Sequence, residues 1–440
     1  MLQFLFTQTP LTFLTQSFWR DEAFTYFLAK RDVLEIISLS IKDFNPPLYY
    51  LLLHYWLILF GSSEISLRSF SFIFYWLTIY LVFLFLTEIL KIDLRKNLLF
   101  FVFYILLFIV NPFLSYYAFE ARAYSLFAFL ATLSYYSFYK KSYKVYFFAT
   151  VLGLYTHYFM LFVLLSQAFF NFLVSKKSHG YEAIKKIFLE PLLIFLPWFF
   201  IVLVAKNFFA SSFWIAKITL KTLVDLLGIL YTGYDGGLPS YSGRITLISI
   251  TILLLLTTLV KMRNKKYELG SHLLLYLSLW AIGVPLLIFF ISLAKPIFFP
   301  RYFIFSTVGF LLFLIYLLDQ AKIGIRILAL IILFAVVFYF QKTQIQYDRK
   351  RDFQKIAREV KVLAKKDDLI YVTSELDFFT AKYYFPTGKI YIYNKSYDEI
   401  PDFVGKVLIS KNDIATSLPY YPKKAFVLSS DGTYSIQALY

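Results

Sequence analysis

The chain has 440 residues, of which 60% are hydrophobic and 16% are charged, and it contains no cysteine. This composition is too apolar for a soluble globular protein, and the lack of cysteine excludes disulfide scaffolds and cysteine-based zinc sites. The formal net charge is +17, and a strong positive charge is common in nucleic-acid-binding proteins. The positions of the basic residues along the chain must therefore show whether this charge indicates a nucleic-acid partner.

An acidic pair, Asp21 and Glu22, stands out in the apolar N-terminal region. One interpretation is structural: Asp21 caps a helix that begins at Glu22, and Glu22 complements the helix dipole. The other is catalytic: a carboxylate at the membrane surface acts as a general base on a hydroxyl group. Because neighbours on a helix do not face the same way, we expect only one of the two to enter a site.

The region before the first span also contains two predicted interfacial helices. One lies within residues 22–42. The other is the apolar stretch 46–61, which is shorter than a span and is interrupted by His54. Asn45 is expected at the N-cap of this second helix, and Pro46 at its first helical position.

Apolar runs recur along the chain, and a helix needs about 20 apolar residues to cross a hydrocarbon core of roughly 30 Å. We therefore predict an α-helical polytopic membrane protein with about ten spans. The predicted spans are residues 66–89, 98–114, 119–138, 144–157, 158–174, 188–205, 243–260, 270–293, 301–318 and 325–340. The fourth and fifth are nearly continuous, with Thr156 and His157 at the turn between them.

Lys and Arg are unevenly distributed between the two sets of alternate loops, and this bias sets the orientation of the chain. One set carries 16 basic residues and comprises residues 91–97, 139–144, 175–186, 261–268 and 319–326. The other carries 4 and comprises residues 115–120, 206–242 and 294–300. The first set is therefore expected to be cytoplasmic. Much of the positive charge is then a topology signal and an attraction to anionic lipids, so we expect no nucleic-acid partner.

This orientation divides the chain into three predicted parts. Residues 1–65 form an outer-face loop with the acidic motif, residues 66–340 the transmembrane domain, and residues 341–440 a domain on the outer face. In the last part, the stretch 348–368 has helical periodicity with a charged face. Four short runs, DLIYVT, KIYIYN, KVLISK and KAFVLSS, then predict strands, so we expect a small α/β domain.

Glu120 and Arg122 lie at the outer edge of the third predicted span. Either they reach the interface and pair with neighbours, or Arg122 contacts an anionic group of the outer leaflet. Residues four apart share a helix face, so Glu120 and Tyr124 are predicted to act together.

Polar residues also lie at the ends of later spans. His157 has the ordinary role of a satisfied hydrogen-bonding residue, with substrate binding as the alternative. Lys295 and Arg301 lie at the outer mouth of two spans, where interfacial anchoring is usual, but Arg301 is also a planar partner for a phosphate. The Gly- and Tyr-rich stretch 231–243 predicts a mobile loop that closes over a substrate. No His/Glu cluster has metal-ligand spacing.

Several motifs occur in an order that is similar to a known family. They are DEA (21–23), NPPLYY (45–50), LLLHYWLILFGSSEISLR (51–68), EARAY (120–124), THYF (156–159) and RYFIFSTVGF (301–310). The set resembles the polytopic GT-C glycosyltransferases of the protein O-mannosyltransferase type (family 39) and their bacterial relatives, including the aminoarabinose transferases. The resemblance covers most of residues 17–320.

The resemblance implies a donor in which a sugar is linked to polyprenyl phosphate, bound from the outer leaflet. The acidic residue that activates the acceptor corresponds to Asp21, with Glu22 second. Arg122 and Arg301 match basic positions of the family and are expected at the donor phosphate, with Lys295 as a further cation. Substrate contacts are expected from residues in or beside these motifs: Asn45, Tyr49, His54, Glu120, Tyr124, His157 and Tyr302.

Two departures from the family pattern bear on this expectation. Aminoarabinose transferases have Lys before the two prolines, where this chain has Asn45, so other cations must contact the phosphate. Family members also have a transmembrane helix before the acidic loop. Here the segment 1–19 has an apolar core too short to span, and it lacks the basic start of a signal peptide. Either the start is truncated or this branch lacks that helix.

We therefore expect an inverting glycosyltransferase in the plasma (inner) membrane, with its active site on the extracytoplasmic face, acting on a hydroxyl of a protein, glycan or lipid. Phosphate is a good leaving group, so no cofactor is indicated, and a divalent metal ion is compatible with the reaction but not required. The alternatives are a transporter or flippase of polyprenyl lipids or glycolipids, which would place ionisable groups near the bilayer midplane, and a non-catalytic membrane scaffold.

Overall fold

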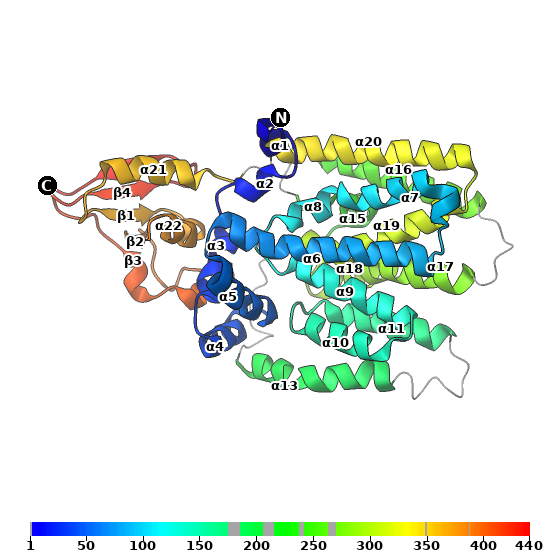
Figure 1. Ribbon diagram of the computed structural model, residues 1–440. Helices are drawn as coiled ribbons and strands as arrows, with labels where there is room; N and C mark the ends of the chain where they lie inside the picture. The colour runs from blue at the N-terminus through cyan, green and yellow to red at the C-terminus, as the bar shows by residue number, and fades with distance from the viewer. Residues whose placement is uncertain are drawn as a thin grey trace. The chain divides into compact units, whose positions relative to one another are not determined.

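The computed structural model describes residues 2–174, 185–205, 215–236, 242–262, 270–347, 350–386 and 388–440. The chain divides into two compact units, and each is described by itself. Unit 1 comprises Met1–Leu11, Ser71–Phe119 and Ala123–Asp348, and unit 2 comprises Thr12–Phe70, Glu120–Arg122 and Arg349–Tyr440. Figure 1 labels their helices and strands.

The described elements of unit 1 are all helical, and its long helices run side by side (Figure 1). Its elements are α1 (Leu2–Gln8), most of α6 (Glu64–Leu84) with η1 (Phe85–Ile89), α7 (Leu94–Ile109), α8 (Pro112–Ala118), α9 (Tyr124–Tyr139), α10 (Tyr143–Leu154), α11 (Met160–Val174), η2 (Lys185–Leu189), α13 (Glu190–Ala205), α14 (Leu220–Val224), α15 (Leu226–Thr232), α16 (Ser242–Met262), α17 (Gly270–Ser278), η4 (Leu279–Gly283), α18 (Val284–Ala294), η5 (Pro300–Phe303), α19 (Ile304–Asp319) and α20 (Ile323–Tyr347).

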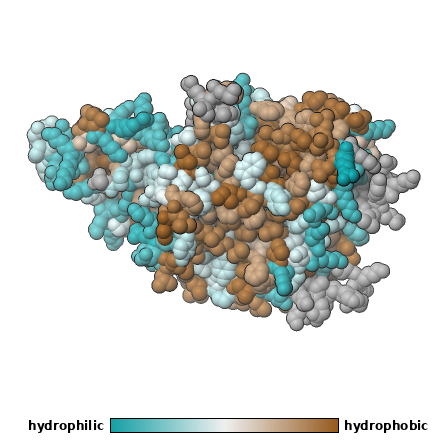
Figure 2. Space-filling model, viewed as in Figure 1, coloured by the Kyte–Doolittle hydropathy of each residue, from teal (hydrophilic) through white to brown (hydrophobic). Residues whose placement is uncertain are grey.

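Six helices among the described residues are long and apolar enough to cross a membrane. They are Glu64–Ile89, Ile187–Ala205, Gly243–Met262, His272–Ala294, Pro300–Asp319 and Ile323–Tyr347. The pair Asn97–Ile109 and Pro112–Ala118, bent by 55°, gives up to seven if it is one span. The predicted polytopic helical membrane protein is confirmed, whereas the count of about ten spans is not. Hydrophobic side chains, brown in Figure 2, cover much of the visible surface of these helices.

The bend between α7 and α8 has a local cause. The side-chain oxygen of Asn111 accepts hydrogen bonds of 3.1 Å from each of the two backbone N–H groups that follow Pro112. Asn111 is therefore a helix N-cap, and Pro112 occupies the first helical position, where its missing N–H costs nothing. The side-chain amide of Asn111 also donates to the carbonyl of Tyr231 over 2.8 Å, which holds the bend in place. The predicted span 98–114 is thus divided.

The predicted span 119–138 begins later than expected, because α9 starts only at Tyr124. Before it, the N–H of Arg122 donates to the carbonyl of Glu120 over 2.8 Å, a turn spacing that a helix does not contain. The prediction that Glu120 and Tyr124 share a helix face is therefore wrong. In the structure Glu120 belongs to unit 2 and Tyr124 to unit 1.

A fully buried tryptophan joins three segments of unit 1. The ring of Trp280 stacks on Tyr135 with centroids 4.0 Å apart, and its N–H donates to the carbonyl of Phe305 over 2.9 Å. A Cβ on Gly309 would lie 2.5 Å from the Trp280 ring, so glycine is required for this approach. The contact fixes α9, η4 and α19 relative to one another.

Unit 2 combines helices from the N-terminal region with an α/β segment from the C-terminal region. Its helices are α2 (Thr12–Thr15), α3 (Arg20–Ala29), α4 (Val33–Asp43), α5 (Leu48–Phe60), the start of α6, α21 (Phe353–Leu363) and α22 (Phe378–Tyr384), with short 3-10 turns η6 (Glu375–Asp377), η7 (Asp402–Val404), η8 (Lys406–Leu408) and η9 (Lys411–Asp413). Residues 22–42, predicted as one helix, thus contain parts of two.

The acidic pair lies inside α3 and not at its cap. Trp19, in an extended conformation, is the N-cap residue, and its carbonyl already accepts from the N–H groups of Glu22 and Ala23 at 3.1 and 3.0 Å. The prediction that Asp21 caps the helix is therefore wrong, because the helix begins earlier. Asp21 and Glu22 both lie in the first turn, where a negative charge complements the helix dipole.

Helix α5 starts at Leu48 with Pro47 at its N-cap, so the predicted cap at Asn45 is wrong. The N–H of Asn45 instead donates to the carbonyl of Ser40 over 3.1 Å and closes the end of α4. A residue that precedes proline is driven away from helical geometry, which applies to Asn45 and to Pro46. The helix can therefore begin only after the second proline.

The described residues of unit 2 contain one sheet of five strands in the order β3-β2-β1-β4-β5. The strands are β1 (Leu369–Val372), β2 (Lys389–Tyr393), β3 (Ile414–Ala415), β4 (Ala425–Leu428) and β5 (Tyr434–Gln437). The first four are parallel and β5 is antiparallel to β4. Strand β4 is buried along its length, as expected of a central parallel strand. Figure 1 shows α21 and α22 beside the sheet, which confirms the predicted α/β domain.

The prediction that the run KVLISK forms a strand is wrong. Its first residues form the 3-10 turn η8, and the strand β3 begins after the run has ended. The turn η8 lies against α4 instead of pairing in the sheet. Gly405, just before η8, has φ +86, and a Cβ there would lie 2.4 Å from the ring of Phe24. The missing side chain thus lets this turn approach α3.

Replacing Gly405 by Ala should lower the unfolding temperature more than replacing Gly432 by Ala. Both glycines have positive φ, but a Cβ at Gly432 would meet only Arg351 at 3.6 Å, an ordinary contact. The difference therefore reports the clash with Phe24 together with the close approach to Phe379 at 3.0 Å, and overpacking of this kind costs about 1–3 kcal/mol. Thermal unfolding of both purified variants in detergent measures it. Equal losses would show that Phe24 does not restrict this position.

Candidate functional site

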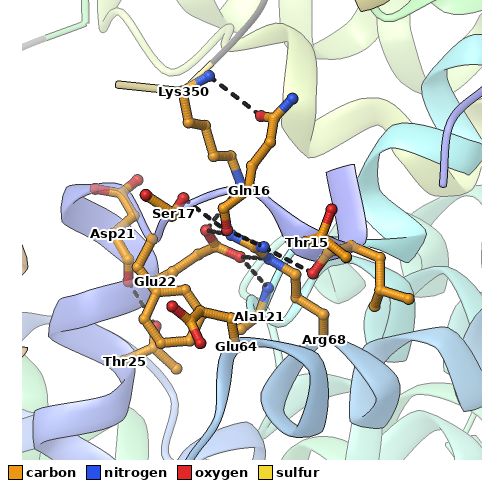
Figure 3. A network of polar contacts seen from close by, with 12 residues as sticks. Thr15, Gln16, Ser17, Asp21, Glu22, Thr25, Glu64, Arg68, Ala121 and Lys350 are labelled. Carbon is orange, nitrogen blue, oxygen red and sulfur yellow. Dashed lines mark hydrogen bonds and ion pairs between the residues drawn. The ribbon is translucent and has the colours of Figure 1, made fainter. Parts of the chain in front are cut away.

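Glu22 and Arg68 form a buried ion pair at the start of α3 (Figure 3). The Nε of Arg68 donates to Oε1 of Glu22 over 2.8 Å, and Nη2 donates to Oε2 over 2.7 Å. Both side chains are 0% exposed. A two-point pair of this geometry is among the strongest polar contacts in proteins, and removal of one partner leaves a buried charge that is costly to keep. The pair ties the first turn of α3 to the first turns of α6.

The guanidinium of Arg68 has no unused donor. Its Nη1 donates to the carbonyls of Leu14 and Gln16 at 3.0 and 2.5 Å, and Nη2 also donates to the carbonyl of Ser17 at 3.2 Å. With the two bonds to Glu22, these contacts match the five N–H donors of an arginine side chain. The segment before α3 is therefore folded around this one cation.

Two more groups complete the surroundings of Glu22. The Nζ of Lys350 lies 2.8 Å from Oε2, with only 6% of the Lys350 side chain exposed, and the N–H of Ala121 donates to Oε1 over 3.0 Å. Burial alone raises the pKa of Glu22, but Arg68 and Lys350 outweigh it and hold that pKa at about 2, below the ordinary 4.5. Burial also lowers the pKa of Lys350, against the opposing effect of Glu22. Glu22 is thus a permanent anion at neutral pH.

Asp21 has different surroundings although it is adjacent. In Figure 3 its carboxylate points away from Arg68, and 14% of the side chain is exposed. Its Oδ1 accepts a hydrogen bond of 2.7 Å from Nε of Arg20. Arg122 lies beside the same turn, where its Nη1 donates to the hydroxyl of Thr25 at 3.3 Å and to the carbonyl of Asp21 at 3.5 Å. Asp21, Glu22 and Arg122 are therefore brought together.

The other predicted site residues of unit 2 have mainly local contacts. The amide of Asn45 donates to the carboxylate of Asp43 over 2.5 Å. Tyr49 is 1% exposed and packs on Phe70, with ring centroids 5.4 Å apart. The Nδ1 of His54 lies 2.9 Å from the carbonyl of Ala29 and connects α5 to the end of α3.

Glu120 is buried, at 1% exposure, and its electrostatic effect reaches Lys350. It is therefore the second carboxylate of the ionic cluster formed by Glu22, Arg68, Lys350 and Glu120. Opposite charges thus accompany one another in this buried cluster, a condition that favours its burial.

Three predicted residues of unit 1 come together from distant parts of the chain. The ring of Tyr302 lies 4.9 Å from that of His157 and 6.4 Å from that of Tyr124. His157 lies in the predicted turn between α10 and α11, and its Nδ1 accepts a hydrogen bond of 3.1 Å from the N–H of Phe159. Its other nitrogen, Nε2, therefore carries the proton in the neutral ring.

The two cations of unit 1 that were predicted to bind the phosphate, Arg301 and Lys295, lie on the connection between α18 and α19. Arg301, next to Tyr302, has a nitrogen 3.8 Å from the carboxylate of Asp235, and its guanidinium lies 4.5 Å from the ring centre of Phe299. Lys295 follows the last residue of α18, and burial lowers its pKa. Arg301, Tyr302, Tyr124 and His157 all belong to unit 1, whereas the carboxylates belong to unit 2.

Sequence reasoning missed Arg20, Arg68 and Lys350. Arg68 ends the motif LLLHYWLILFGSSEISLR, so its place in the resemblance was a usable signal. Arg20 directly precedes the acidic pair. Lys350 lies in a basic run, DRKRD, which by itself predicts only a solvated face.

Among the described residues, no group of three or more His, Cys, Asp or Glu side chains could hold a metal ion. The predicted mobile loop 231–243 starts inside α15, where Tyr231 is buried. Residues 237–241 of that loop lie outside the described residues, as do residues 206–214 of the longer stretch 206–242.

The helical bundle and the small C-terminal sheet have a GT-C type membrane fold. Two solved structures that are similar to it are of ArnT from Cupriavidus metallidurans, a GT-C aminoarabinose transferase. The apo structure matches with a TM-score of 0.55 at 13% identity, covering 88% of this chain and 82% of ArnT. The structure bound to undecaprenyl phosphate matches with a TM-score of 0.56 at 13% identity, covering 98% and 93%.

No protein-family model matches the sequence, and no curated protein is similar to it. The likeness to ArnT confirms the predicted GT-C fold, in the form found in aminoarabinose transferases. The resemblance to mannosyltransferases stays a prediction. At 13% identity the likeness establishes the fold of this multi-pass membrane protein and leaves its activity to be argued from residues.

Acidification should destabilise the protein through Glu22. Since the folded-state pKa is about 2 and the ordinary value is 4.5, the stabilisation is fully present above pH 4.5 and is lost as the pH falls toward 2. We expect a steep fall of the unfolding temperature between about pH 5 and pH 2. Glu22→Gln should be less stable at pH 7 by about 3 kcal/mol or more and should lack much of this fall.

The matched control is Glu35→Gln, because Glu35 forms an exposed pair with Arg31 at 3.8 Å. Exposed pairs contribute about 1 kcal/mol or less, so this variant should follow the wild-type pH profile. A Glu22→Gln protein with wild-type stability and pH dependence would contradict the assignment.

Proposed function

We propose that this protein transfers a sugar from a polyprenyl-phosphate donor to a hydroxyl acceptor, with inversion at the anomeric carbon. The observation that carries the proposal is a carboxylate, Asp21, beside a cation in a chain with the fold of an ArnT that binds undecaprenyl phosphate. The multi-pass membrane character supports a lipid-linked substrate, because such a donor lies in the bilayer.

Asp21 is the better candidate for the base, and Glu22 for a structural role. A general base must reach its proton donor and exchange its own proton during the reaction. Glu22 is enclosed by Arg68 and Lys350 and is held ionised with a pKa of about 2, so it is a weak base without access to solvent. Asp21 is partly exposed, and its carboxylate pairs with Arg20. In the reaction Asp21 would take the proton of the acceptor hydroxyl as its oxygen attacks the sugar.

Cations stabilise the phosphate that leaves from the opposite side of the sugar. Arg122 beside the Asp21 turn, and Arg301 and Lys295 between α18 and α19, are the proposed donor-phosphate ligands. Their charge counts most as negative charge grows on the leaving phosphate. His157, with Tyr124 and Tyr302 around it, is proposed to bind the substrate, and Asn45 and His54 are proposed as further substrate contacts. Tyr49 and Glu120 are buried, so we propose that they support the site from within unit 2.

The proposed location is the plasma (inner) membrane, with the site on the extracytoplasmic face. The uneven distribution of Lys and Arg among the loops supports this orientation. Donor binding from the outer leaflet and a water-borne or lipid acceptor on the same side are both consistent with it.

Asp21→Asn should abolish sugar transfer while the protein remains folded, since loss of a general base lowers rates by about 10²–10⁴-fold. Mass spectrometry of glycans and lipids from a deletion strain that carries each variant measures the product. Asp32→Asn is the control, because Asp32 is exposed and its side chain makes no cap hydrogen bond. Full activity of Asp21→Asn would show that Asp21 is not the general base.

Arg301→Ala should weaken binding of undecaprenyl phosphate by about ten- to a hundredfold, because a charge-assisted hydrogen bond contributes about 1.5–3 kcal/mol. Arg301→Lys keeps the charge but loses the planar fork, so it should recover part of the loss. Arg358→Ala, on the exposed side of α21, is the charge-matched control. Titration of the purified proteins with undecaprenyl phosphate is the measurement, and unchanged binding in Arg301→Ala would remove this residue from the donor site.

A further inference from the structure

We propose that Lys350 and the segment that follows it position the catalytic turn, so that the C-terminal part of the chain is needed for transfer. Lys350 acts through Glu22 and not on the substrate. The inference rests on the proposed role of Asp21, since Asp21 and Glu22 are neighbours in the first turn of α3.

Lys350 has an unusual place for a lysine. Its ammonium group lies 2.8 Å from Glu22, and only 6% of the side chain is exposed. Glu22 already has a two-point pair with Arg68, so Lys350 is not needed to neutralise that carboxylate. Burying a second cation is costly unless it is balanced, and Glu120 supplies the balancing charge. The ion pair with Glu22 joins Lys350, and with it the start of the segment that follows, to the first turn of α3.

The segment after Lys350 makes further contacts with the start of α3. The N–H of Lys350 donates to the side-chain oxygen of Gln16 over 3.2 Å, which Figure 3 also draws. The N–H of Gln354 donates to the hydroxyl of Ser17 over 3.0 Å. From α22, the hydroxyl of Tyr384 accepts from the N–H of Phe18 over 2.8 Å.

Tyr384 and Gln354 also donate hydrogen bonds to Glu64, at the start of α6. The hydroxyl of Tyr384 donates to the Glu64 carboxylate over 2.7 Å, and the amide of Gln354 donates to the same oxygen over 2.8 Å. Residues 16–18 are therefore held from two directions, by Arg68 from α6 and by the segment from Lys350 to Tyr384. Catalysis is sensitive to misplacement of a reacting group by about 1 Å, so loosening either side should displace Asp21.

The test compares full-length proteins with substitutions at Lys350. Lys350→Met removes the charge at similar length, Lys350→Arg keeps it, and Lys355→Met is the control, because Lys355 is an exposed lysine on α21. Each is also made in a Glu22→Gln background. Initial rates are measured with undecaprenyl phosphate–aminoarabinose as donor probe and a membrane extract of the deletion strain as acceptor. Binding of undecaprenyl phosphate and the unfolding temperature are measured alongside.

We expect Lys350→Met to lower kcat by about tenfold or more, with KM for the donor and binding of undecaprenyl phosphate within about twofold of wild type. Lys350→Arg should restore most of the rate, and Lys355→Met should resemble wild type. In the Glu22→Gln background, removal of Lys350 should cause little further loss, because a residue that acts through Glu22 has nothing left to position. A role in stability alone would not produce this pattern.

A Lys350→Met protein with wild-type kcat would overturn the proposal. So would weakened binding of undecaprenyl phosphate that persists in the Glu22→Gln background, since Lys350 would then be a direct phosphate ligand. If Lys350→Met does not fold, Tyr384→Phe replaces it: it removes only the hydroxyl between Phe18 and Glu64, and a wild-type kcat there overturns the proposal as well. Failure of the proposed function is distinct, because then Asp21→Asn would keep the activity of wild type.

Discussion

The buried pair between Glu22 and Arg68 is the constraint on which the structure of unit 2 depends. Each charge has lost its water, so neither can be kept without the other, and the remaining donors of Arg68 bind the backbone of the segment before α3. The position of the first turn of α3 is thereby set by a residue on α6. The carboxylates of this turn therefore have a defined position within unit 2.

In the proposed function, the two adjacent acidic residues have different roles, because one carboxylate cannot both anchor a turn and act as a general base. A group that anchors a turn must stay ionised and enclosed, whereas a general base must be reachable and must change its protonation state. Glu22 is enclosed and ionised, whereas Asp21, one position earlier, is partly exposed and is the proposed base. The helix separates them, because consecutive side chains project in different directions. In the proposed function the acidic pair is therefore one anchor and one general base, and not two equivalent candidates.

Much of the fold followed from composition and periodicity. Long apolar runs and the alternating Lys/Arg bias indicated a polytopic helical protein, and the strands Leu369–Val372, Lys389–Tyr393 and Ala425–Leu428 were predicted from short apolar runs. The predicted boundaries of helices were wrong where a local interaction or a proline determined the backbone conformation. Asn111 capped a new helix inside one predicted span, and the two prolines after Asn45 delayed the start of α5. The run KVLISK packed on a helix, a contact that a strand pattern does not encode.

The sequence by itself determined the membrane class, the GT-C resemblance and the choice of the acidic pair, because apolar length, charge bias and short motifs are properties of neighbouring residues. Only the tertiary structure decided which carboxylate is enclosed, because Arg68 and Lys350 are far from Glu22 along the chain. It also brought Tyr124, His157 and Tyr302 together from three separate motifs. The physical reason is that burial and long-range ion pairing depend on which distant segments pack together, and no local pattern in the chain records that choice.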